Sequence, residues 1–185
     1  MKKLLLLTAL LVSSCCTTCR DDCGLTPEEA RKERALAHQM NERIHDELQG
    51  EGYFTMDSTE YYGCPPYISD SYSTILYHYT AIEDARNVIC RIVKEYLIAY
   101  NNDASIRPLF HGGPITPEDL HISVYFYDNN HDTLASPYIS RVECNQGQIN
   151  YYILNDDEVS ERVSQEPYEY ARDRTPNNAA TAKPL

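Results

Sequence analysis

The chain has 185 residues, of which 28 are acidic and 16 basic, so its formal net charge is −12. Such a charge repels nucleic-acid phosphates and gives no attraction to an anionic lipid surface, so we expect no nucleic-acid partner and no charge-driven membrane binding. The aromatic residues are 16 Tyr and 3 Phe, with no Trp. A tyrosine ring packs while its hydroxyl stays in water, which suits half-exposed sheet faces and interaction surfaces, although a compositional habit explains the count equally well.

The N-terminus has the three parts of a secretory signal. Lys2 and Lys3 form a positive start, residues 4–12 are apolar, and two small serines follow. The apolar run is far shorter than the ~20 residues that a membrane-spanning helix needs. We therefore expect a signal peptide over residues 1–14 rather than a transmembrane helix.

The end of this signal resembles the lipobox of bacterial lipoproteins. In Val12-Ser13-Ser14-Cys15 a branched apolar residue stands three positions before the cysteine, with two small residues between them. The resemblance implies cleavage before Cys15, a diacylglycerol on its sulfur and acylation of its new amine, and several acyl chains anchor a protein stably. Valine where leucine is commoner departs mildly from the pattern, and an ordinary cleaved signal beside a cysteine is the alternative.

The residue after the modified cysteine bears on the choice of membrane. In lipoproteins of two-membrane bacteria, Asp at this position often means retention in the inner membrane. Here the residue is Cys16, so the resemblance favours the outer membrane.

With Cys15 lipidated, six cysteines remain, an even number that permits disulfides in an oxidising compartment. The sequence does not reveal which of them pair. Three lie in a short tether over residues 15–24, where cross-links between copies or to other envelope proteins are favoured over a metal cluster, since a second half-site and a nearby histidine are missing. The six candidate disulfide cysteines are Cys16, Cys19, Cys23, Cys64, Cys90 and Cys144.

The first predicted helix starts at Thr26-Pro27-Glu28-Glu29, which combines a capping threonine, proline at the first helical position and a glutamate three residues after the cap. A single narrow apolar stripe on an otherwise charged helix predicts a position on the domain surface or against a partner. His38 and His45 lie seven residues apart, whereas zinc pairs on helices lie four apart, so we expect both to be solvated, with a metal site as the weaker alternative. The stripe consists of Leu36, Met40, Ile44 and Leu48, and it ends at Gly50 and Gly52.

The next region is less regular until a second helix begins. Cys64-Pro65-Pro66 breaks any regular element, and residues 73–79 are rich in Tyr and Ile and predict a strand. Thr80-Ala81-Ile82-Glu83 repeats the capping-box pattern, and the helix is predicted to run to about residue 101. Cys90 lies beside its apolar face and has the character of a small buried hydrophobe. That wide face makes this helix the best core candidate: Ile82, Ala85, Ile89, Ile92, Val93, Tyr96 and Tyr100.

The C-terminal half predicts a loop and then strands. Residues 104–119 are rich in Pro and Gly and predict a loop that ends in a short helical turn from Thr116. Residues 122–127 alternate apolar and polar positions, and two further strands, 138–144 and 149–154, are joined by a hairpin. Consecutive strands with short links are typical of an antiparallel meander.

These elements predict a single α+β domain over residues 25–160, with two helices and a small antiparallel meander sheet, one helix packed on one sheet face. Beyond about Ser160 the hydrophobic periodicity fades. We therefore predict a weakly structured to disordered tail over residues 161–185.

One segment has an enzyme-like pattern. Leu76-Tyr77-His78-Tyr79-Thr80 resembles the Leu-Tyr-His-Tyr-Thr segment of some ADP-ribosyltransferase-like toxins and related domains, where the histidine contacts the nicotinamide-side ribose of NAD. The resemblance implies that role for His78 and makes NAD the cofactor of this alternative. The long helix predicted after the segment departs from the family, which usually has a shorter one. No motif supports the other candidate residues, which are Tyr125, Tyr127 and Tyr138 for stacking on nicotinamide and Glu143 and Glu158 as the catalytic glutamate.

Three other groups are weaker candidates. His111-Gly112-Gly113 lacks the Gly-x-Ser-x-Gly nucleophile elbow that an oxyanion loop accompanies. Glu118 and Asp119, close to His121, favour the first turn of a short helix. Asn155-Asp156-Asp157-Glu158 offers oxygen ligands for calcium, but the twelve-residue calcium loop is absent and a helix cap explains the segment as well.

We therefore predict a membrane-anchored envelope lipoprotein that is a non-enzymatic binding or structural protein, with the NAD-using transferase as the alternative. The expected attached group is the covalent lipid on Cys15, and no metal site is predicted. The expected partners are the membrane, through the anchor, and envelope proteins.

Overall fold

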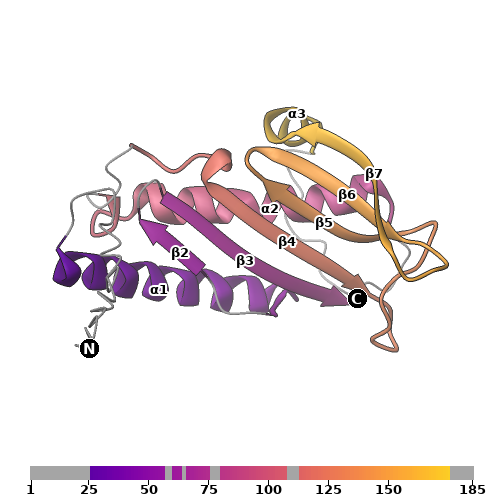
Figure 1. The fold of residues 1–185 in the computed structure, drawn as a ribbon, viewed down its shortest axis with the longest axis horizontal. Coiled ribbons are helices and arrows are strands. Elements are labelled where there is room, and N and C mark those ends of the chain that lie inside the picture. Colours follow the sequence, from indigo (N-terminus) through magenta and orange to yellow (C-terminus); the bar gives the residue numbers. More distant parts are fainter. Residues whose placement is uncertain (1–25, 57–59, 64–65, 76–79, 108–112, 176–185) are drawn as a thin grey trace, which may run out of the picture.

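The computed structural model describes residues 26–56, 60–63, 66–75, 80–107 and 113–175. Within these residues three α-helices and a seven-stranded mixed sheet form an α+β fold, as predicted (Figure 1). The elements in chain order are α1 (Pro27–Gly50), β1 (Phe54–Thr55), β2 (Glu60–Gly63), β3 (Pro66–Ile75), α2 (Ile82–Asn102), the 3-10 turn η2 (Pro117–Asp119), β4 (Leu120–Tyr127), β5 (Ile139–Asn145), β6 (Gln148–Leu154), β7 (Ser160–Pro167) and α3 (Tyr168–Arg174).

The sheet combines an antiparallel meander with one parallel pair. The strand order is β1-β3-β4-β5-β6-β7, and β2 also pairs with β3. Strands β4 to β6 form the predicted meander, which β7 extends. β3 lies parallel to β4, with Ile68 opposite Leu120 and Ile75 opposite Tyr127. The predicted purely antiparallel sheet is therefore wrong at this pair, because β3 reaches β4 through α2, and a helical crossover produces parallel strands.

All three helices pack on one face of the sheet. α2 contacts β4, β5 and β6, α1 contacts α2 and the strands β1 and β2, and α3 contacts α2, β6 and β7. Figure 1 shows α1 and α2 running along the sheet, with α3 at the β7 end. The side chains of Ile122, Val124 and Phe126 on β4 point into the resulting core and are fully buried. We call this side the covered face, and the opposite side, over which no described helix packs, the open face.

The first helix begins as predicted, but the second begins one residue late. The Thr26 hydroxyl accepts a hydrogen bond from the Glu29 amide at 3.3 Å, and the Glu29 carboxylate accepts one from the Thr26 amide at 2.8 Å. In α2 the cap is Ala81, whose amide donates to the Asp84 carboxylate at 3.3 Å. Thr80 is buried instead, and its carbonyl accepts the Ile139 amide at 3.1 Å from the start of β5. Because this hydrogen bond holds Thr80 against β5, the cap of α2 lies one residue later, at Ala81.

The strand that precedes α2 differs from its prediction. β3 covers Pro66–Ile75, whereas we expected residues 73–79, of which 76–79 lie outside the described residues. The covered-face positions of β3 include Asp70 and Thr74, both buried, so the apolar alternation that marks a strand is interrupted. Of the break predicted at residues 64–66, Cys64 and Pro65 lie outside the described residues, and Pro66 is the first residue of β3.

The residues after 160 are ordered through 174, which corrects the predicted tail for that stretch. β7 pairs along β6, and α3 then places Tyr168 and Ala171 in the core. Most residues of β7 are exposed, so the strand has little apolar periodicity for a sequence to display.

The predicted turns are largely confirmed. Gln146 and Gly147 form the β5–β6 turn with φ values of 49° and 73°, as two-residue hairpin turns require, and η2 begins after Thr116. Residues 155–158 form the β6–β7 turn rather than a helix cap, with the Asn155 side chain accepting the amides of Asp157 and Val159.

Candidate functional site

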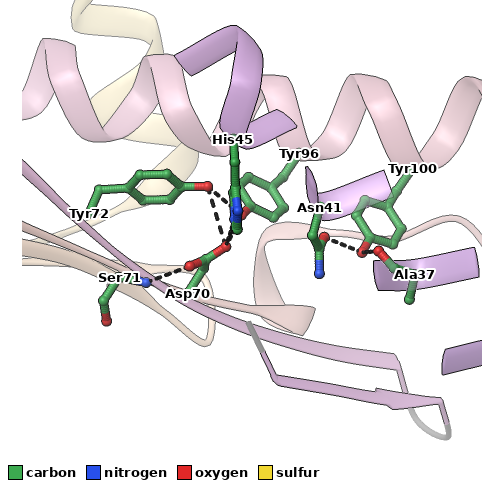
Figure 2. A network of polar contacts seen from close by, with 8 residues as sticks. All are labelled: Ala37, Asn41, His45, Asp70, Ser71, Tyr72, Tyr96 and Tyr100. Atoms are coloured by element: carbon green, nitrogen blue, oxygen red, sulfur yellow. Dashed lines mark hydrogen bonds and ion pairs between the residues drawn. The ribbon is translucent and has the colours of Figure 1, made fainter. Parts of the chain in front are cut away.

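A buried polar cluster joins α1, β3 and α2 on the covered face (Figure 2). Asp70 lies at its centre with a fully buried side chain, and its carboxylate lies 2.5 Å from the His45 ring nitrogen Nε2. The same carboxylate accepts the Tyr72 hydroxyl at 3.3 Å and also the Tyr96 hydroxyl, while its other oxygen accepts the Ser71 amide at 2.8 Å. The two tyrosine hydroxyls lie 2.6 Å apart.

This cluster corrects the expectation for one of the two histidines of α1. His45 was expected to be solvated, but its side chain is only 20% exposed because it reaches down to Asp70. His38 is 70% exposed and lies 3.3 Å from the carboxylate of Glu42 on the same helix, as expected for a solvated residue.

The geometry of the cluster is that of a structural clamp. Burial raises the pKa of the Tyr72 and Tyr96 hydroxyls, and the nearby Asp70 carboxylate raises it further, so both phenols stay protonated as donors. Beside them, the Tyr100 hydroxyl contacts the Asn41 side chain at 2.5 Å and the Ala37 carbonyl at 3.3 Å (Figure 2). Because these contacts join His45 and Asn41 on α1 to Asp70 on β3 and to Tyr100 on α2, the cluster fixes α1 against α2 and the sheet.

The open face carries a different set of side chains, which the strand register arranges in rows. Neighbouring strands place residues opposite one another, so the open-face side chains of six strands line up across the sheet. The aromatic–arginine row consists of Phe54, Ser73, Tyr125, Arg141, Tyr152 and Arg162. The polar row beside it consists of Met56, Ser71, Ser123, Glu143, Asn150 and Gln165.

Arg141 lies at the centre of the aromatic–arginine row. Its guanidinium carbon is 4.0 Å from the centroid of the Tyr152 ring and 5.8 Å from that of Tyr125. Its buried Nε has no hydrogen-bond partner, and the carboxylate of Glu143 lies 3.9 Å from Nη2. The guanidinium is thus held by two rings but is only loosely neutralised.

Glu143 supplies the one carboxylate in these two rows. It accepts the Tyr152 hydroxyl at 2.6 Å, and its other oxygen lies 4.0 Å from Nε2 of His121. Burial raises the pKa of Glu143, but hydrogen bonds from His121 and Tyr152 and the charge of Arg141 outweigh burial and lower it. Glu143 is therefore ionised at neutral pH, which is unlike a general acid.

A hollow lies on the open face at the ends of β3 and β4. It has a volume of about 400 Å³ and is lined by Phe54, Met56, Ser73, Tyr127 and His131. Phe54 and Met56 are 46% and 44% exposed, so they form an apolar wall in contact with water. Ser73 lies between the larger residues Phe54 and Tyr125 on the neighbouring strands, so its small side chain leaves space between them.

The candidate NAD residues are only partly brought together. Tyr125 and Glu143 share the open face and Tyr127 lines the hollow, whereas Tyr138 packs against the core and Glu158 is exposed in the β6–β7 turn. His78 and the segment 111–112 lie outside the described residues, so the NAD alternative stays a prediction.

The two cysteines that the structure describes are free and buried. Burial raises the pKa of the Cys90 thiol to about 11 and that of Cys144 to about 12, so both thiols stay protonated and unreactive at neutral pH. Cys90 lies on α2 and is a small buried hydrophobe, as expected, but neither of these two candidate disulfide cysteines takes part in a disulfide. Cys15, Cys16, Cys19, Cys23 and Cys64 lie outside the described part of the chain.

The described residues contain neither a metal cluster nor a membrane-spanning helix. Over the described ranges no three His, Cys, Asp or Glu side chains are grouped to hold a metal ion, and no helix there has the length and apolarity to cross a bilayer. Asp119 instead caps the 3-10 turn by accepting the Thr116 amide at 2.8 Å, and His121 faces Glu143.

Sequence reasoning missed Asp70, Arg141 and Tyr152. The register of the hairpin β5–β6 was readable and would have paired Arg141 with Tyr152, but Asp70 could be found only once β3 was known.

Comparison with protein-family models, curated proteins and solved structures finds no match to this chain. Its function therefore has to be argued from the two faces of the sheet.

Proposed function

We propose that the protein is an envelope lipoprotein that binds another envelope protein through the open face of its sheet, without catalysing a reaction. The observation that carries the proposal is the aromatic–arginine row. Tyrosine and arginine are the residue types enriched at the energetic centres of protein interfaces, because each combines a large contact area with hydrogen-bonding capacity.

The contrast between the two faces supports this choice of surface. On the covered face, the Asp70 carboxylate already accepts several donors and is sealed from water. On the open face, the Arg141 side chain is 26% exposed and its Nη2 lies 3.9 Å from the Glu143 carboxylate, so a bound protein can accept hydrogen bonds from the accessible part of the guanidinium. A half-exposed tyrosine such as Tyr152 loses little conformational entropy on binding, since it has few rotatable bonds and already packs against Arg141.

The lipid anchor would keep this surface near a membrane. Helix α1 begins at Pro27, so about twelve residues separate the proposed lipid on Cys15 from the domain, and an extended chain of that length spans roughly 40 Å at most. We therefore propose that the partner lies within the envelope, at or close to the same membrane.

Site-specific photo-cross-linking in intact envelopes tests the binding surface. A photoreactive residue at Tyr125 on the open face should give a discrete cross-linked species, and one at Ile98, an exposed position of α2, should not. Adding Arg141→Gln to the Tyr125 probe should weaken that species. Equal cross-linking from both positions, or none from Tyr125, would refute the proposed surface.

Replacing Cys15 tests the anchor. Cys15→Ala should release the protein from the membrane fraction and remove the mass of the acyl chains, with Cys16→Ala as the matched control that stays lipidated. If Cys15→Ala remains membrane-bound with an unchanged mass, the lipoprotein proposal fails.

A further inference from the structure

We infer that the partner of the open face is an extended peptide segment bearing one large apolar side chain and, four residues away on the same side, a carboxylate. This inference rests on the proposed binding function and names the chemistry of the partner. Its two halves come from two places in the aromatic–arginine row: the hollow around Ser73 and the guanidinium of Arg141.

The hollow fits an apolar anchor. Its volume of about 400 Å³ exceeds that of any single side chain, and Phe54, Met56 and Tyr127 provide most of its walls. Phe54 and Met56 are nearly half exposed, so covering them with a Phe, Leu or Met side chain removes apolar surface from water on both partners. A sugar ring would leave its hydroxyl groups against these apolar walls, which favours a peptide over a glycan.

The charge of the open face selects an acidic segment. The aromatic–arginine and polar rows contain Arg141, Arg162 and Glu143 as their charged side chains, so these rows are positive, whereas the whole chain carries −12. Glu143 is occupied by the Tyr152 hydroxyl at 2.6 Å and lies 3.9 Å from Nη2 of Arg141, whose side chain is 26% exposed. A carboxylate from the partner would complete the shell of Arg141 in a charge-assisted contact.

Strand spacing sets the separation of the two features. Ser73 on β3 and Arg141 on β5 are two strands apart, which is roughly 10 Å at ~4.8 Å per strand. An extended peptide advances ~3.3 Å per residue. Successive side chains of an extended peptide point to opposite faces, so two that both face the sheet are an even number of positions apart. Phe54 on β1, in the wall of the hollow, is three strands from Arg141, which is roughly 14 Å. The apolar residue and the acidic residue should therefore be four positions apart, a span of ~13 Å, in a segment that crosses the strands.

Selection from a random library tests this inference without knowledge of the natural partner. The probe is a phage-displayed library of random dodecapeptides, panned on the full-length chain in detergent micelles. We expect enrichment of peptides with Phe, Leu or Met four positions from Asp or Glu. Enrichment of no peptide, or of peptides without this pair, would overturn the inference.

Two variants then locate the selected peptide. Ser73→Trp fills the hollow and Met56→Ser removes part of its exposed wall, and each should lower affinity about tenfold, as loss of a hydrophobic contact does. Ile98→Trp on α2 is the matched control and should have no effect. A thermal melt of each variant confirms folding, and unchanged affinity in both Ser73→Trp and Met56→Ser would overturn the placement.

A double-mutant cycle tests the carboxylate. Arg141→Gln should weaken the acidic peptide about tenfold but leave its Glu→Gln or Asp→Asn version unchanged, whereas Arg172→Gln, on exposed α3, should affect neither. An equal loss for both peptides contradicts a contact between Arg141 and the carboxylate.

Tighter binding of oligosaccharides, or a dimer that Ser73→Trp disperses, would overturn the peptide in favour of a glycan or a second copy. If Tyr125 cross-links a partner but no such peptide is enriched, the proposed function stands and this inference falls.

Discussion

The two faces of the sheet use the same residue types for opposite purposes. On the covered face, Asp70 gathers His45, Tyr72 and Tyr96 into a cluster that is closed to water. On the open face, Arg141 lies between two tyrosine rings and keeps an unused donor. A tyrosine therefore stabilises the fold where its hydroxyl hydrogen-bonds to a buried group such as Asp70. It can contribute to a binding surface where its ring packs beside a group such as Arg141 that lacks a hydrogen-bond partner. Substitutions on the two faces should therefore separate stability from binding.

The largest effect should follow loss of the central acceptor on the covered face. Asp70→Ala should lower the free energy of unfolding by about 3–5 kcal/mol, because Tyr72, Tyr96 and His45 then share a buried space without the carboxylate. Urea denaturation measures this loss. Asp173→Ala at an exposed position of α3 should stay within about 0.5 kcal/mol, and a similar loss in both variants would contradict the clamp.

A second carboxylate on the covered face should confer sensitivity to acid. Glu166 accepts Nε of Arg86 at 2.6 Å and the Tyr151 hydroxyl at 2.5 Å. Burial raises the pKa of Glu166, but these hydrogen bonds outweigh it and lower the pKa below 4.5. Its stabilisation is therefore complete well above pH 4.5 and is lost as the pH falls through the lowered value.

Replacing this carboxylate should flatten that dependence. Glu166→Gln should cost about 1.5–3 kcal/mol at neutral pH and show a smaller loss of stability on acidification than the unmodified protein. Chemical denaturation at a series of pH values measures both. Identical slopes for variant and parent would show that Glu166 does not link folding to protons.

The two histidines of α1 provide an internal comparison of moderate size. His45→Ala should cost about 1–2 kcal/mol through its lost contact with Asp70, whereas His38→Ala should change stability by less than about 0.5 kcal/mol. Thermal melts of the two variants side by side give the difference. Equal melting temperatures would place His45 outside the clamp.

The smallest effect on stability should come from the open face. Arg141→Gln should cost no more than about 1 kcal/mol, the range of a partly exposed cation–π contact, while weakening the Tyr125 cross-link. Denaturation and cross-linking on the same preparation test the two together. A loss of several kcal/mol would make Arg141 part of the stabilising framework instead of the binding surface.

Helices α1 and α2 and the β4–β6 meander could be predicted because their signals are local, whereas α3 lies in the segment that was predicted to be a tail. Thr26 and Glu29 cap α1, and Ile122, Val124 and Phe126 alternate with polar neighbours along β4. Strand β3 was misplaced because a buried acid, Asp70, occupies a core position, and no local pattern indicates that His45 and two tyrosines will satisfy it. The parallel pairing of β3 with β4 is likewise a consequence of the crossover through α2.

The sequence indicated the kind of surface that forms the candidate site, but not which residues make it up. A tyrosine-rich chain suggested a half-exposed sheet face, and the structure has one, but its rows depend on the pairing of six strands. β7 was missed because its exposed residues have no apolar alternation, and without it Arg162 had no place beside Tyr152. The lipid anchor at Cys15 stays a prediction, because it falls outside the described residues.

The parallel pair β3–β4 also has a consequence for how the chain folds. Ile68 on β3 pairs with Leu120 on β4, and all of α2 lies between them in the sequence. In the β5–β6 hairpin, only a two-residue turn separates the first paired residues, Asn145 and Gln148. Contacts between distant residues form slowly, since a long loop must close before they stabilise anything. A chain that emerges N-terminus first therefore holds β3, the strand with which β1 and β2 pair, without its partner β4 until that strand follows. The meander that appears last should be the folding nucleus, and the strands that appear first should dock onto it at the end.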